Sequence, residues 1–227
     1  MKLIYNDKEN ALLDAAMELF THYGYDKTTV SEIAKKTGIS KGAVYLNFDS
    51  KKAIMDNLLF RESQKYNRRW LQLVDEDPQG GLLSGMYRNI LSALLESPLI
   101  SSYFCKNNKI LDGYLNENDQ TSYGELIRAD FIKELQEVGA VRSDVDPVET
   151  AHIMDMLAFA FVRKESLKAV DTILDIGDII KSISEMMDRA FTPEDGGDSN
   201  AGKQVLHKLI DEAINHYEKE SGQKYTK

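Results

Sequence analysis

The chain has 227 residues, a net charge of −9, and a composition of 42% hydrophobic and 29% charged residues. These values are typical of an ordinary soluble globular protein with room for a large core in one or two domains. No run of about 18 apolar residues exists, so no membrane span is expected. Residues 1–10 lack the basic and apolar segments of a secretory signal. The single cysteine, Cys105, excludes an internal disulfide and favours a cytoplasmic location.

Apolar residues recur at helical spacing along the chain, and no stretch alternates in the manner of a strand. Few prolines among many Leu, Ala, Lys and Glu residues also favour an all-α fold. The pattern predicts three short N-terminal helices followed by a larger helical bundle. In chain order, the predicted helices cover about residues 8–23, 30–36, 41–48, 51–74, 82–96, 99–111, 120–138, 147–170, 176–191 and 203–219.

Local signals mark the ends of the first helices. Gly24 stands where a left-handed C-cap would end the first helix. Thr29 and Glu32 have the spacing of a capping box at the start of the second. Gly38 then allows a sharp turn, and Ser40 can cap the third helix. The second and third helices are therefore short and separated by a tight glycine turn.

Charge is distributed unevenly along the sequence. Residues 1–52 hold eight lysines against seven acidic residues, a net charge of +1, which leaves −10 for the remainder. An acidic body of this kind is incompatible with wrapping nucleic acid. A small DNA-facing end is compatible with it, because phosphate contacts need only a local cluster of donors.

The second and third predicted helices have the layout of a helix-turn-helix, whose second member enters the DNA major groove. Residues 40–43 (SKGA) give the third helix a small, polar and basic N-terminal face that can approach base edges closely. Val44 and Phe48, four residues apart, would anchor this helix against the core.

A series of residues within the range 11–59 follows a fixed order without gaps: Ala15-Ala16, Leu19-Phe20, Gly24, Thr28-Thr29, Ile33-Ala34, Gly38-Ile39-Ser40, Gly42, Tyr45, Phe48 and Lys51. A generic three-helix bundle would share the periodicity but not this order of Thr, Gly, Tyr and Lys. With these elements, residues 11–59 resemble the N-terminal domain of the TetR-type transcriptional repressors. The resemblance covers under a quarter of the chain.

The resemblance implies DNA contacts at eight positions. Side chains at the start of the third helix would face bases, one on the second helix would reach the groove edge, and the others would meet phosphates. The implied contact residues are Thr29, Ser31, Ser40, Lys41, Ala43, Tyr45, Asn47 and Lys51.

Two of these assignments have a structural alternative, and one stretch departs from the family pattern. Tyr45 is either a phosphate donor or a half-buried spacer, and Lys51 is either a phosphate contact or a solvated helix start. Leu46 and Asn47 stand where two aromatic or histidine residues commonly follow the tyrosine. Leu46 either packs against the protein or touches DNA.

The resemblance also implies a homodimer formed through late helices of the larger domain, and an unidentified small-molecule effector that releases the DNA. Residues 176–187 carry a wide apolar stripe, and residues 155–162 are apolar nearly all round. Such helices must be sandwiched, either in a dimer or within the core of one chain.

An apolar and adaptable effector pocket would be lined by aromatic and methionine side chains with a few polar anchors. The same residues would equally serve as ordinary core, and a hydrophobic or amphipathic ligand is favoured. The candidates are Trp70, Tyr87, Tyr103, Phe104, Tyr123, Arg128, Phe131, His152, Met156 and Phe159.

These expectations divide the chain into a helix-turn-helix domain (1–50), a helical ligand-binding and dimerisation domain (51–192), an acidic linker (193–202) and a C-terminal amphipathic helix (203–227). We expect a repressor that binds double-stranded DNA at a palindromic operator. The alternative is a ligand-binding or scaffold protein without DNA binding. A helical enzyme lacks a catalytic constellation.

No cofactor or metal is expected. Glu149, His152 and Asp155 share one predicted helix, but a metal would need further ligands from elsewhere. Cys105 beside Lys106 is either a redox-sensitive thiol or a structural one.

Overall fold

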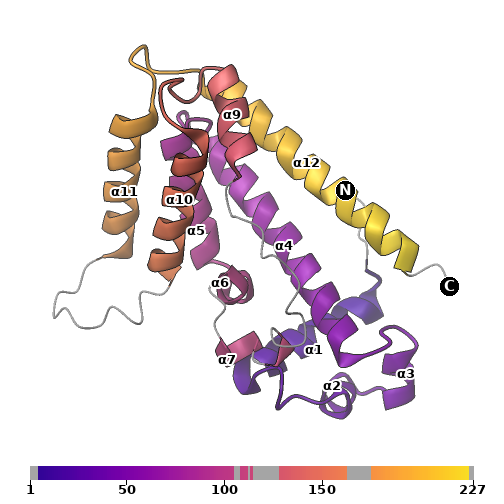
Figure 1. The fold of residues 1–227 in the computed structure, drawn as a ribbon. Helices are drawn as coiled ribbons and strands as arrows, with labels where there is room; N and C mark the ends of the chain where they lie inside the picture. Colours follow the sequence, from indigo (N-terminus) through magenta and orange to yellow (C-terminus); the bar gives the residue numbers. More distant parts are fainter. Residues whose placement is uncertain (1–4, 105–107, 112, 115–127, 163–174, 225–227) are drawn as a thin grey trace. The chain divides into compact units, whose positions relative to one another are not determined.

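The computed structural model describes residues 5–104, 108–111, 113–114, 128–162 and 175–224 (Figure 1). For residues 104, 108, 109, 159, 162 and 216–224, the structure describes the backbone but not the side chain. The described residues form helices and contain no strand, which confirms the all-α prediction. None of the described helices combines the length and apolarity that crossing a bilayer requires.

The described helices follow the predicted order closely, with most boundaries within a few residues. In chain order they are α1 (Asp7–Tyr23), α2 (Val30–Thr37), α3 (Lys41–Tyr45), α4 (Lys51–Glu76), α5 (Leu83–Leu95), α6 (Pro98–Phe104), α7 (Asn108–Leu111), α9 (Ala129–Glu137), α10 (Pro147–Val162), α11 (Ile176–Phe191) and α12 (Ser199–Lys224).

The caps that define the helix-turn-helix form as predicted. The Glu32 backbone N–H donates to the Thr29 hydroxyl at 3.2 Å, and the Thr29 backbone N–H donates to the Glu32 carboxylate at 2.7 Å. This reciprocal pair satisfies donors that the first turn of α2 would otherwise leave free. Gly38 ends α2 in the left-handed conformation, with φ +72°, which a side chain would strain.

The largest differences from the predicted boundaries concern α3, α6, α7 and α12. α3 ends at Tyr45, three residues before its predicted end. The single helix expected over residues 99–111 is described as α6 and α7, on either side of residues 105–107. α12 begins four residues early because Asp198 caps it: the Asp198 carboxylate accepts the Ala201 N–H at 2.9 Å. Part of the expected linker is therefore helical. The predicted helical residues 120–127 and 163–170 lie outside the described residues.

The chain forms two compact units, the first made of Met1–Ser63 and Ser97–Tyr123. It holds α1 to α3, the first half of α4, α6 and α7. Its core combines Phe20 of α1, Ile33 of α2 and Val44 of α3, all fully buried, with residues of α4, α6 and α7. Complete burial of such a side chain contributes roughly 1.5–3 kcal/mol. The helix-turn-helix is thus packed together with a segment far along the chain.

The second unit comprises Gln64–Glu96 and Gly124–Lys227. α11 packs along α5, and α9 contacts both α10 and α12 (Figure 1). The backbone of the first turn of α12 lies directly against the backbone of the turn between α4 and α5. A Cβ on Gly81 would lie 1.7 Å from the Ser199 carbonyl oxygen, and one on Gly202 would lie 2.0 Å from the Gly81 oxygen. Only glycine fits at these two positions.

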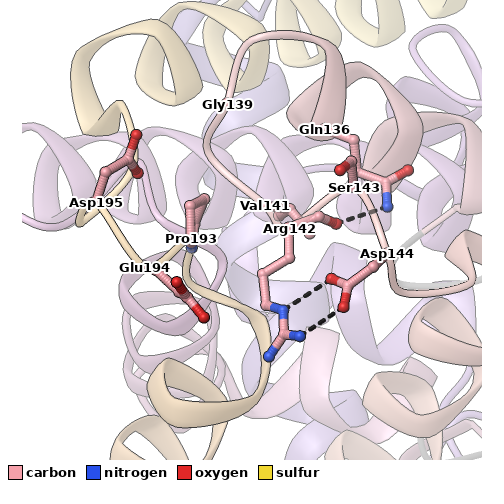
Figure 2. Close-up of a pocket in the computed structure, with 9 residues that line it drawn as sticks. All are labelled: Gln136, Gly139, Val141, Arg142, Ser143, Asp144, Pro193, Glu194 and Asp195. Atoms are coloured by element: carbon pink, nitrogen blue, oxygen red, sulfur yellow. Dashed lines mark hydrogen bonds and ion pairs between the residues drawn. The ribbon is translucent and has the colours of Figure 1, made fainter.

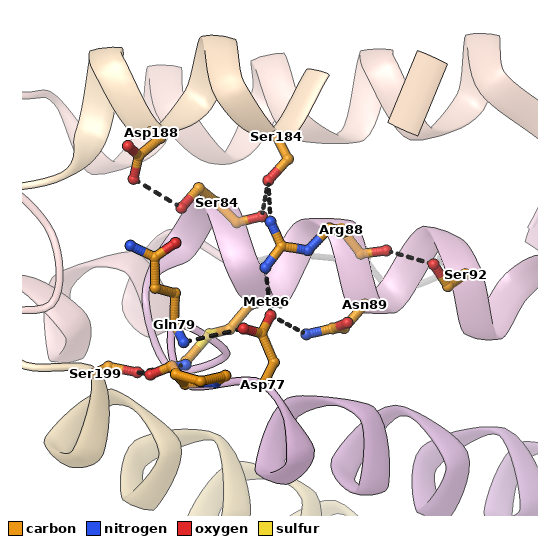
Figure 3. A network of polar contacts seen from close by, with 12 residues as sticks. Asp77, Gln79, Ser84, Met86, Arg88, Asn89, Ser92, Ser184, Asp188 and Ser199 are labelled. Carbon is orange, nitrogen blue, oxygen red and sulfur yellow. Dashed lines mark hydrogen bonds and ion pairs between the residues drawn. The ribbon is translucent and has the colours of Figure 1, made fainter. Parts of the chain in front are cut away.

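A polar network joins α5, α11 and the turn after α4 within the second unit (Figure 3). The Arg88 guanidinium pairs with the Asp77 carboxylate and donates to the Ser184 hydroxyl at 3.0 Å. Burial by itself would raise the pKa of Asp77. The hydrogen bonds from Arg88, from the Gln79 backbone N–H and from Asn89 outweigh it and lower that pKa below its ordinary value.

Candidate nucleic-acid interface

α3 and the turn after it present rows of side chains at the i, i+4 spacing of a helix. The inner row is Val44 and Phe48, both buried in the core of the first unit. Their burial anchors α3 and leaves the remaining rows turned away from the core. This arrangement confirms the predicted anchoring of the third helix.

One outward row consists of Gly42 and Leu46. The Leu46 backbone N–H donates to the Gly42 carbonyl oxygen at 3.2 Å, so the two residues stand one turn apart. A Cβ on Gly42 would have only the Ser40 hydroxyl oxygen nearby, at 4.0 Å. Leu46 is 87% exposed, and it therefore does not pack against the first unit.

A second outward row consists of Lys41 and Tyr45. The Lys41 ammonium lies 5.8 Å from the centroid of the Tyr45 ring, a weak cation–π contact at an exposed site. Tyr45 is 42% exposed, and among the described residues none is hydrogen-bonded to its hydroxyl. A cation and a phenolic donor thus stand together on the surface of α3.

The polar residues at the edges of α3 are partly engaged within the helix. The Ser40 hydroxyl accepts the Ala43 backbone N–H at 3.1 Å, which leaves its own hydrogen free to donate. The Asn47 amide donates to the Ala43 carbonyl oxygen at 2.7 Å, with its second N–H and its oxygen still available. Ala43 is half-buried between them.

At the start of α2, the Thr29 hydroxyl is held by a carboxylate. It donates to Glu32 at 2.8 Å, while Ser31 beside it is exposed. Hydrogen bonds from the Thr29 backbone and then from its side chain lower the pKa of Glu32. A phosphate reaching Thr29 would have to displace this carboxylate, since both are anions seeking the same donors.

Lys51, at the start of α4, is engaged inside the first unit. Its ammonium donates to the Tyr25 carbonyl oxygen at 2.8 Å and lies 4.1 Å from the centroid of the buried Tyr25 ring. A solvated helix start would leave this cation in water. Lys51 instead ties α4 to the connection between α1 and α2, a role that no local pattern around Lys51 indicates.

Sequence reasoning also missed two exposed cations. Lys27 precedes α2 and Lys35 lies in its last turn, and neither has an acidic partner within the described part of the chain. Lys36, by contrast, pairs with Glu18 of α1 at 2.6 Å. The uneven placement of lysines over residues 27–41 was the available signal.

The contacts of residues 110–114 with Tyr25, which lies between α1 and α2, and with α4 were not predictable from local patterns. The Tyr25 backbone N–H donates to the Ile110 carbonyl oxygen at 2.9 Å. The Tyr114 hydroxyl donates to the Asp56 carboxylate of α4 at 2.7 Å. The Tyr25 and Tyr114 rings meet edge to face, with centroids 5.4 Å apart.

Several of the proposed pocket residues lie in the core of the second unit. The Trp70 indole N–H donates to the Met86 carbonyl oxygen at 3.1 Å, and the Tyr87 hydroxyl donates to that of Met154 at 2.8 Å. Phe131 is also buried. Two further candidates, Phe104 and Phe159, have side chains outside the described residues.

The other pocket candidates are not gathered with this core. His152 and Met156 lie on an exposed face of α10, and Arg128 is exposed and pairs with Asp130 at 2.9 Å. Tyr103 packs against the core of the first unit. The last candidate, Tyr123, lies outside the described residues.

A crevice of about 360 Å³ opens between the loops at residues 139–144 and 193–195 (Figure 2). Its walls carry mainly polar groups, and the Arg142 guanidinium is held by both oxygens of the Asp144 carboxylate at 2.6–2.8 Å. Glu194 and Asp195 stand on the opposite loop. This lining does not suit a hydrophobic effector.

α10 and α11 each carry exposed apolar side chains. They are Val148, Ile153 and Met156 on α10 and Met186 on α11. The described residues contain no group of three or more His, Cys, Asp or Glu side chains placed to hold a metal ion.

Comparison with known proteins identifies the helix-turn-helix region. The model of the bacterial regulatory proteins of the tetR family matches residues 12–58. Residues 12–58 of the first unit are therefore similar to the TetR-type domain of these regulators. An HTH-type negative transcriptional regulator of the biofilm operon icaADBC, IcaR of Staphylococcus aureus, is 44% identical over 48 residues. That match covers 21% of this chain and 26% of IcaR, in keeping with a TetR-type domain on an otherwise divergent body.

The likeness to regulators also extends beyond the TetR-type domain. The uncharacterized HTH-type transcriptional regulator YuxN of Bacillus subtilis is 25% identical over 199 residues, which is 82% of this chain and 67% of YuxN. The chain thus spans about two thirds of YuxN and about a quarter of IcaR.

Solved structures share the fold of both the TetR-type domain and the helical body. The transcriptional regulator SCO4942 of Streptomyces coelicolor superposes with a TM-score of 0.57 at 19% identity, over 82% of this chain and 98% of that protein. The regulator FadR of Bacillus subtilis, solved with stearoyl-CoA, gives a TM-score of 0.54 at 21% identity, over 78% and 96%.

Proposed function

We propose that this protein is a transcription repressor that binds a palindromic DNA operator as a homodimer and leaves it when a small molecule binds. The outward face of α3 is the observation that carries this function. This face carries Gly42 with open space around it, the Lys41 cation and the free Tyr45 hydroxyl. The buried side chains Val44 and Phe48 anchor the opposite face of this short helix in the core. A helix of this kind fits the major groove.

The DNA contacts divide into base-facing and phosphate-facing groups. Lys41, Ser40 and Ala43 face the bases, and Ser31 reaches the groove edge. The Tyr45 hydroxyl and the free N–H of Asn47 donate to phosphates.

Thr29 and Lys51 act differently from the free donors. Thr29 reaches a phosphate only when Glu32 releases its hydroxyl, since that hydroxyl already donates to the carboxylate. Lys51 holds α4 against Tyr25, so its contribution to DNA binding runs through the position of the helix.

Dimerisation uses the exposed apolar side chains of α10 and α11. A single reading helix contacts few bases, and two copies on half-sites one helical turn apart provide the specificity. Met156 and Met186 are more than half exposed, and covering such side chains removes apolar area from water.

The effector we propose is hydrophobic and carries a hydrogen-bond acceptor. FadR, which shares this fold, was solved with stearoyl-CoA. In this chain the Gln64 side chain is 9% exposed, and its amide nitrogen lacks a hydrogen-bond partner among the described residues. A buried donor without an acceptor costs about 1–3 kcal/mol, and a ligand carbonyl or carboxylate would satisfy it.

A mobility-shift assay with DNA from upstream of the protein's own gene tests DNA binding. We expect a shifted complex, weakened at least tenfold by Tyr45→Phe, which removes only the hydroxyl, because a hydrogen bond to a charged group contributes about 1.5–3 kcal/mol and a homodimer carries two such hydroxyls. Tyr23→Phe is the matched control, since Tyr23 is an exposed tyrosine at the end of α1. Absence of any complex, or equal binding by both variants, would favour a ligand-binding protein without this DNA contact.

A further inference from the structure

Leu46 is the most exposed large apolar residue in the described part of the chain. A lone leucine on a protein surface is common and needs no special explanation. Its position gives it significance, because it stands one turn after Gly42 on the outward face of α3. The sequence pattern left open whether Leu46 packs or touches DNA, and its exposure removes the first option for the isolated chain.

Gly42 determines how near this row can come to another surface. Without a Cβ, and with open space around it, the helix backbone can approach base edges closely. Val44 and Phe48 are buried behind it, so the row cannot turn inward. A helix that approaches at Gly42 brings the Leu46 methyl groups to the groove floor one turn further on.

The major groove offers few apolar groups for such a side chain. The 5-methyl group of thymine is the apolar feature of a base-pair edge there, and the other features are hydrogen-bond donors and acceptors. The leucine side chain has no polar atom and cannot form hydrogen bonds with these groups. We propose that Leu46 is a specificity-determining residue that recognises the 5-methyl group of one thymine in each operator half-site. This inference rests on the proposed DNA-binding function.

Neighbouring side chains leave this contact to Leu46. Asn47 directs its amide to the Ala43 carbonyl oxygen, and Tyr45 carries Lys41 over its ring. The row of Lys41 and Tyr45 therefore contacts phosphates and polar base edges, and the row of Gly42 and Leu46 contacts a methyl group.

The test deletes the methyl group from the DNA and the side chain from the protein. Operators are selected from random DNA with the wild-type protein, and each thymine of one half-site is replaced in turn by deoxyuridine. Equilibrium binding is then measured at one salt concentration for wild type and for Leu46→Ala.

At one thymine we expect deoxyuridine to weaken wild-type binding about fourfold, the effect of about 0.8 kcal/mol for one buried methyl-sized group. At that thymine it should leave Leu46→Ala binding unchanged. Leu95→Ala, a partly exposed leucine of α5, serves as the control and should keep the wild-type response. Thermal unfolding of Leu46→Ala should match wild type, because the side chain is exposed.

Three outcomes separate this inference from the function on which it rests. Recovery of no bound DNA by the wild-type protein refutes the DNA-binding function itself. Tight binding with the same deoxyuridine response in wild type and Leu46→Ala at every thymine refutes the role of Leu46 alone. Loss of affinity in Leu46→Ala that is equal for all sequences also refutes it, since that result reports a general contact.

Discussion

Replacing Gly42 with alanine is expected to stabilise the folded protein while weakening its grip on DNA. The added methyl group meets only the Ser40 hydroxyl oxygen, at 4.0 Å, which is ordinary contact. Glycine within a helix costs roughly 0.5–1 kcal/mol relative to alanine. For a chain of this length, that gain corresponds to a melting temperature higher by about 1–4 °C.

The same methyl group stands between α3 and the bases. It holds the backbone away from the groove by about the thickness of a methyl group and weakens contacts to one base, each worth on the order of 1–3 kcal/mol. We expect operator affinity to fall about tenfold or more per half-site. Fluorescence anisotropy on labelled operator measures this loss, and calorimetry on the same preparation measures stability.

Gly38→Ala is the control that distinguishes the effect of room for a methyl group from the effect of backbone conformation. Gly38 also has open space around it, but its φ of +72° is strained for alanine, so this variant should lose about 1 kcal/mol or more. If Gly42→Ala binds the operator as tightly as wild type, the close approach of α3 to DNA at Gly42 is refuted. If Gly42→Ala is less stable than wild type, the expected gain in helix stability at this position is refuted.

Three further predictions concern residues inside the two units. Lys51→Met should lower the free energy of unfolding in urea by about 1–2 kcal/mol, because the ammonium loses the Tyr25 carbonyl and ring; unchanged stability would show that this cation is merely solvated. The Asp77 pKa is lowered in the folded state, so its contribution to stability is present above the unfolded value near 3.9 and is lost as pH falls through the lower folded value. Acid unfolding curves of wild type and Asp77→Asn should therefore converge in that range, and curves that stay parallel would contradict the pairing with Arg88. Gln64→Leu should raise the melting temperature and weaken binding of an acyl-CoA probe, whereas a lower melting temperature would mean that the amide is already satisfied.

Local signals allowed much of the DNA-binding face to be predicted. Thr29, Glu32 and Gly38 form their cap and turn through neighbours within a few residues, and such contacts are visible in sequence. The anchoring of α3 by Val44 and Phe48 also follows from spacing alone. The predictions were accurate where a residue's partners lie within about one helical turn.

Predictions were weakest where partners lie far apart in the chain. Lys51 meets Tyr25 across 26 residues, and Ile110 accepts a hydrogen bond from Tyr25 although a long stretch of sequence separates them. Helical periodicity says which residues share a face but not which element covers that face. The sequence therefore could not reveal that residues 97–123 belong to the unit that carries the helix-turn-helix.

The helices of the second unit show a related difficulty. Residues 155–162 of α10 are apolar nearly all round, so their pattern does not select the buried side. Met154 is buried, while Met156, two residues later, is more than half exposed. The start of α12 was missed for another reason: Asp198 lies in a glycine-rich acidic stretch that reads as a linker, although it caps the helix.

Hydroxyl-radical footprinting on DNA from upstream of the protein's own gene tests the central claim most directly. A homodimer that reads a palindrome with two copies of α3 should protect two patches related by two-fold symmetry, with centres about 34–36 Å apart, one helical turn. A single protected patch, or continuous protection without symmetry, would contradict the dimeric reading of DNA. Unprotected DNA at concentrations where the protein is folded would contradict the proposed function as a whole.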